Sequence, residues 1–68
     1  MRFYLTFGQA HAHHVGDVTF DKDCVAVVEA DDYEAARVRV WDHFGNQWSQ
    51  LYDEQPKMNY YPRGLVTL

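Results

Sequence analysis

Cysteine, basic residues and long apolar runs are all scarce in this 68-residue chain. Its one cysteine, Cys24, forms no internal disulfide and no CxxC pair, so nothing indicates an oxidising compartment. No apolar run has the length of a signal peptide or a membrane span, so we expect a cytoplasmic protein without a membrane anchor. Six basic residues against ten acidic ones disfavour nucleic acid as a partner.

Large apolar residues, by contrast, are plentiful. The apolar fraction of 47% and the aromatic fraction of 16% are enough to fill one small core and argue against disorder. A chain of this size hides only about 60% of its unfolded surface, so its stability margin is thin. Residues 1–68 therefore form one domain.

Two alternating segments predict a long N-terminal β-hairpin. Residues 2–7 and 24–30 have the period-2 pattern of strands. Gly16-Asp17 between Val15 and Val18 suits a two-residue type II′ turn, which needs glycine at its first central position. The residues that share the core face are Phe3, Leu5 and Phe7 in the first arm and Cys24, Ala26, Val28 and Ala30 in the second.

The turn also predicts a register for the whole hairpin. Val15 faces Val18 and His13 faces Phe20, and a one-residue slip would move the apolar sets to opposite faces. The pairs further along are His11 with Lys22, Gln9 with Cys24, Phe7 with Ala26, Leu5 with Val28 and Phe3 with Ala30. A bulge at Gly8 would shift the pairing beyond it by one residue.

One amphipathic helix follows the hairpin. Asp31 and Glu34 have the spacing of a capping box, and Gly45 after Phe44 suits a C-terminal cap, so we expect about three helical turns between them. Its core face holds Tyr33, Ala36, Val40 and Phe44, with Arg37 and Trp41 at the margin and Val38 opposite.

Two further extended segments, 47–53 and roughly 59–68, complete the predicted fold. Pro56 suits the turn between them, and Pro62 makes the last strand short or peripheral. The fold class is therefore α+β: a long N-terminal hairpin and one helix on a small, mainly antiparallel sheet, in the order ββαβ or ββαββ. The predicted core is Phe3, Leu5, Phe7, Ala26, Val28, Ala36, Val40 and Phe44.

The histidine cluster is the strongest chemical signal. His11 and His13, two apart on a strand, point to one face and are within reach of one metal ion. A third ligand such as His43 would complete a metal-binding module, which is the alternative interpretation. The favoured interpretation is that these histidines are interfacial or hydrogen-bonded hairpin residues, and we expect no metal or other cofactor.

Catalysis has little support in the sequence. Ser49 and Cys24 are the nucleophile candidates, and Cys24 lies on the apolar face of its strand. The carboxylate pairs Asp21/Asp23 and Asp53/Glu54 are interpreted as solvated edges, and Asp31/Asp32 as a helix cap. We therefore expect a protein that is not an enzyme.

Aromatic residues near the C-terminus offer a second possible surface. Tyr52, Tyr60 and Tyr61, with Arg63 and Trp48 nearby, have the composition of a base-stacking platform or of a protein-binding hot spot. The favoured interpretation is that the rings fill the core and that Asp53 or Glu54 holds Arg63. A small nucleotide or nucleic-acid binder stays as a further alternative.

Several strings in combination resemble a known group of proteins over nearly the whole chain. They are residues 5–11, LTFGQAH; residues 19–25, TFDKDCV; residues 44–48, FGNQW; residues 52–54, YDE; and residues 61–64, YPRG. They resemble small uncharacterised proteins encoded by actinobacterial phages. The resemblance implies a setting in the host cytoplasm, in which a short acidic domain binds and modulates a host protein of a defence system or of the transcription machinery.

The hairpin tip is the first expected contact surface. In the predicted register His11, His13, Val15, Val18 and Phe20 continue the core face beyond the reach of a three-turn helix. A host protein or a second copy of the chain would cover this stripe, unless the C-terminal strands do. Tyr60, Tyr61 and Arg63 form the second expected contact surface.

Overall fold

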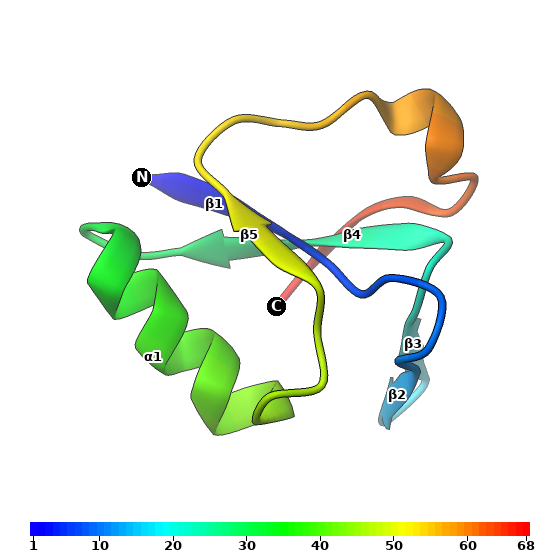
Figure 1. Cartoon of the computed structure of the whole chain (residues 1–68), viewed down its shortest axis with the longest axis horizontal. Coiled ribbons are helices and arrows are strands. Elements are labelled where there is room, and N and C mark those ends of the chain that lie inside the picture. The colour runs from blue at the N-terminus through cyan, green and yellow to red at the C-terminus, as the bar shows by residue number, and fades with distance from the viewer.

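The computed structural model describes residues 1–68 and contains one α-helix, six short strands and one 3₁₀ turn (Figure 1). In chain order these are β1 (Arg2–Thr6), β2 (His13–Val15), β3 (Val18–Phe20), β4 (Cys24–Glu29), α1 (Tyr33–Phe44), β5 (Gln50–Tyr52), η1 (Met58–Tyr60) and β6 (Gly64–Thr67). The predicted α+β class is confirmed.

Four strands form the main sheet in the order β5-β1-β4-β6. Strand β1 is antiparallel to β4, as the predicted hairpin requires, and it is also antiparallel to β5. Strand β6 runs parallel to β4, so the sheet is mixed. The crossover from β5 to β6 passes over the sheet face opposite α1 (Figure 1). This crossover, which contains η1, allows the last strand to enter the sheet in the parallel direction.

The N-cap of helix α1 is one residue later than expected. The Asp32 side chain accepts a hydrogen bond from the backbone N–H of Ala35 at 2.8 Å and is the N-cap, so the predicted Asp31/Glu34 capping box is wrong. The C-terminal prediction is confirmed. Gly45 has φ 62°, and its N–H donates to the Trp41 carbonyl at 2.9 Å.

The predicted core is confirmed. All eight of its residues are buried between the main sheet and α1, together with Phe20, Cys24 and Leu51. Strand β4 also buries Val25 and Val27 on its other face. Since α1 covers only one face, the crossover between β5 and β6 is the element that lies over this second face (Figure 1).

The predicted hairpin register is right at the tip and wrong at the base. His13 pairs with Phe20 and Val15 with Val18, as expected. Near the open end, however, Leu5 pairs with Ala26, whereas the prediction paired it with Val28. Between the tip pairs and the base pairs the first arm contains two more residues than the second arm. These extra residues lie in the turns between β1 and β2, where Gly8 has φ 66°. Because the shift is even, every side chain keeps its predicted face. The strand pairs of the tip and of the base belong to two separate sheets.

Candidate functional site

The hairpin tip is covered more than the sequence predicts. Phe20 is only 3% exposed, and its ring centroid lies 5.8 Å from that of Phe7 and 5.3 Å from that of Phe44. The last turn of α1 thus reaches the base of the tip. The expectation that Phe20 belongs to an uncovered stripe is wrong, because Phe44 fills the space in front of it.

His13 is packed into the same aromatic cluster. Its ring centroid lies 4.8 Å from that of Phe44, and its Nε2 donates to the Gln47 carbonyl at 2.7 Å. A carbonyl oxygen can only accept a hydrogen bond, so Nε2 carries a proton here. His13 therefore links the tip to the loop after α1, in agreement with the hydrogen-bonded interpretation of this residue.

Only the end of the tip remains open. Val15 and Val18 are exposed and His11 is half-buried. Of the five tip residues expected to bind a partner, Phe20 is buried and His13 is half-buried like His11, so Val15 and Val18 offer most of the exposed surface. Two valines beside a turn form a much smaller contact area than the full stripe that was predicted.

The alternative metal site is not assembled. The structure contains no group of three or more His, Cys, Asp or Glu side chains placed to hold a metal ion. Besides the bond from His13 to Gln47, the Nδ1 of His43 lies 2.8 Å from the Arg39 carbonyl within α1. His11, His13 and His43 therefore do not form the ligand set that the spacing suggested.

Arg63 has a different partner from those expected. Its Nη2 forms an ion pair with Oδ1 of Asp21, and not with Asp53 or Glu54, while its backbone N–H donates to the Asp23 carbonyl at 2.9 Å. The Asp23 N–H also donates to Asp21 Oδ1 at 3.0 Å. This hydrogen bond, reinforced by Arg63, lowers the pKa of Asp21.

These contacts give Arg63 a structural role. They link the residue before β6 to the turn between β3 and β4. Asp21 is therefore not the solvated residue at a sheet edge that the sequence suggested. Tyr52 and Tyr60 are exposed and Tyr61 is half-buried, so the expectation that these tyrosine rings fill the core is wrong. An arginine already paired with a carboxylate is less available to a phosphate, which weakens the base-stacking alternative.

Cys24 lies in the core. Burial raises the pKa of its thiol, and its Sγ lies 3.7 Å from the carbonyls of Thr19 and Asp21. An activated thiol needs the opposite shift and access to solvent. The thiol therefore acts as a small apolar side chain in this fold.

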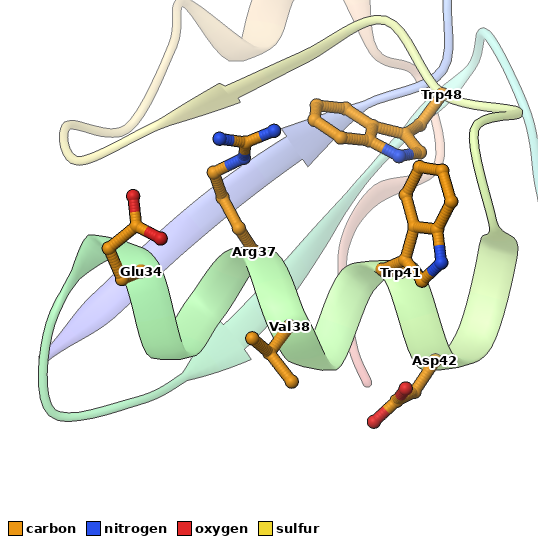
Figure 2. A pocket seen from close by; sticks show the side chains of 6 residues that line it. All are labelled: Glu34, Arg37, Val38, Trp41, Asp42 and Trp48. Carbon is orange, nitrogen blue, oxygen red and sulfur yellow. The ribbon is translucent and has the colours of Figure 1, made fainter.

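A hollow in the surface lies along α1, where the sequence interpretation placed no site. This α1 groove has a volume of about 300 Å³ and is lined by Glu34, Arg37, Val38, Trp41, Asp42 and Trp48 (Figure 2). Trp41 is 60% exposed and Val38 is 59% exposed. Two large apolar side chains on one exposed helix face need an explanation that one isolated valine does not.

Trp48 forms a fixed wall of the groove. Its indole N–H donates to the Gly45 carbonyl at 2.8 Å, and its half-buried ring packs against the core. The residues on both sides of Trp48 are held by backbone hydrogen bonds, since the Gln47 N–H donates to the Phe44 carbonyl and the Ser49 N–H donates to the Thr6 carbonyl. Trp48 therefore lies beside α1 and against the core, as the favoured interpretation of the aromatic residues has it, and not in the alternative stacking platform.

The charged side chains of the groove have no ionic partner within the chain. The three salt bridges of the structure join Arg2 to Glu29, Lys22 to Asp23 and Arg63 to Asp21. In Figure 2, Arg37 extends on the side of the groove nearer Trp48, and Asp42 lies on the opposite side. Trp41 and Arg37 are of the residue types that dominate protein-binding hot spots, and both line this exposed surface.

The sequence carries a signal for this groove. Residues 34, 37, 38, 41 and 42 follow the i, i+3, i+4, i+7, i+8 spacing of a helix face, about a third of a turn from the core face. The sequence interpretation assigned Trp41 and Arg37 to the margin of the core and considered Val38 alone. The position of Trp48, which comes from outside the helix, required the tertiary structure.

Comparisons of the chain with protein-family models, curated proteins and solved structures give no match. The one helix of the structure lacks the length and apolar composition needed to cross a membrane.

Proposed function

We propose that this chain is a small non-enzymatic interaction protein, encoded by an actinobacterial phage, that binds and modulates a protein in the host cytoplasm through the α1 groove. The observation that carries the proposal is the 60% exposure of Trp41 beside the equally exposed Val38 and the fixed ring of Trp48. The resemblance of the sequence to small phage proteins supplies the setting.

Trp41 carries a large ring that this small domain leaves outside its core. A 68-residue domain has a thin stability margin and gains from burying each large ring. Trp41 nevertheless remains mostly in water, and its indole makes no hydrogen bond within the chain. Removing a ring of this kind from a hot spot typically costs at least about 2 kcal/mol of binding free energy.

The test compares Trp41→Ala with Tyr60→Ala, because both replace an exposed aromatic ring and they lie on different surfaces. A host protein captured by the wild-type chain is identified, purified and titrated against each variant. We expect Trp41→Ala to raise Kd by roughly 30-fold or more and Tyr60→Ala to leave it nearly unchanged. Melting curves of both variants check that each remains folded.

The opposite result would place the binding site on a different surface. If Tyr60→Ala weakens binding and Trp41→Ala does not, the surface of Tyr60, Tyr61 and Arg63 is the contact. A third variant, Val15→Asp, tests the open end of the hairpin tip in the same titration. If no host protein binds the wild-type chain in a defined two-component assay, the proposed function is wrong.

A further inference from the structure

We infer that a second copy of this chain covers the α1 groove when no other partner is present, with the two α1 helices side by side and parallel about a two-fold axis. The inference rests on the proposed function in one respect, because both treat the α1 groove as a protein contact surface. It adds that a host protein has to compete with a second copy for this surface.

The spacing of four residues on α1 suits a helix pair. At about 100° per residue, Val38 and Trp41 occupy the middle of the exposed face, and Arg37 and Asp42 lie on its opposite borders. Figure 2 shows this separation of Arg37 from Asp42. Apolar residues in the middle and charged residues on both borders are the pattern by which paired helices associate.

The charges select the parallel arrangement. When a two-fold axis parallel to the helices relates the two copies, the border that holds Arg37 in one copy lies against the border that holds Asp42 in the other. Arg37 and Asp42 are five residues apart, which is about 7.5 Å along the helix axis. Arg37 and Asp42 of each copy then form two identical ion pairs. In an antiparallel pair each border would meet its own equivalent, which brings Arg37 toward Arg37 and Asp42 toward Asp42.

Both charged residues are free to make these contacts, because neither takes part in any of the three salt bridges within the chain. Val38 and Trp41 would be removed from water at the same time, with Trp48 at the edge of the contact. One three-turn helix offers less than the roughly 800 Å² per partner of a standard interface. We therefore expect a weak dimer that forms and dissociates readily.

Glu34 sets a limit on this dimer. It lies one turn before Val38 on the same face, so the parallel arrangement places it near Glu34 of the second copy. Two like charges at this position weaken the association. Glu34→Gln removes the repulsion and is expected to tighten the dimer several-fold.

The decisive experiment is a charge exchange followed by sedimentation over a range of concentrations. Arg37→Asp and Asp42→Arg each place like charges in both pairs and are expected to raise the dimer Kd by roughly tenfold or more. An equimolar mixture of these two variants restores both ion pairs, so it is expected to form a heterodimer. Arg39→Asp, an exposed charge reversal outside the α1 groove, is the control and leaves the dimer unchanged.

Three results would overturn the inference. The wild-type chain could remain monomeric at every concentration, the single reversals could dimerise as well as wild type, or the mixture could fail to restore the dimer. Each of these leaves the proposed function open to its own test. A chain that stays monomeric but loses its host partner on Trp41→Ala has the proposed function without self-association, and a dimer without any host partner shows the reverse.

Discussion

Replacing Leu5 by alanine tests the centre of the fold. Leu5 is 0% exposed and lies on β1, an inner strand of the main sheet. It pairs with Ala26 of β4 on one side and with Leu51 of β5 on the other, and it belongs to the cluster that α1 covers. Because β1 has hydrogen-bonded strands on both sides, the backbone has little freedom to close the space left by the side chain.

The expected loss of stability follows from two contributions. Leucine exceeds alanine by three carbon atoms, which at about 0.8 kcal/mol each amounts to about 2.4 kcal/mol of lost burial. A cavity that does not collapse adds to this, so we expect a total of about 3–5 kcal/mol. A 68-residue domain has an unfolding free energy on the order of 3–10 kcal/mol, so Leu5→Ala removes a large part of it.

Urea denaturation followed by circular dichroism measures this loss. With a slope of about 1 kcal/mol per molar urea for a small protein, the midpoint should fall by about 3–5 M or the variant should already be unfolded. Leu65→Ala is the matched control, since it makes the same change on β6 at a side chain that is 42% exposed. An unshifted midpoint for Leu5→Ala, or an equal shift for Leu65→Ala, would refute the assignment of Leu5 to the core.

Two further predictions concern ionisable groups. The pKa of Asp21 is lowered in the folded state, so its contribution to stability is present at neutral pH and is lost as the pH falls from about 5 through the folded pKa. Asp21→Asn should flatten this acid-side dependence of stability and loosen Arg63, and an unchanged pH profile from pH 2 to about 6 would contradict it. Addition of a strong chelator should leave the melting temperature unchanged, because no three ligands are grouped; a large loss of stability would require a metal site after all.

Some features of this protein follow from its sequence because they depend on neighbouring residues. Alternation along β1 and β4 determines which side chains face the core, and it does so whichever residues are paired across the strands. The Gly16-Asp17 turn determines the pairing of Val15 with Val18, since two residues are enough to specify the turn. Gly45 ends α1 for a similarly local reason, because its positive φ is readily adopted only by glycine.

Contacts between distant segments were decided by the tertiary structure. The two-residue offset between the tip and base of the hairpin has no visible signal, because an even shift preserves every face and therefore every apolar pattern. The parallel direction of β6 depends on how the crossover passes over the sheet, which no local period encodes. The same applies to the ion pair between Arg63 and Asp21, which are 42 positions apart.

The candidate site combines both kinds of information. Sequence spacing alone places Arg37, Val38, Trp41 and Asp42 on one helix face, because the helical period is local. Whether that face lies against the sheet or in water depends on which helix face the sheet covers, and on the loop that brings Trp48 beside it. The sequence thus determines the composition of the surface, and the packing of α1 determines that it is exposed.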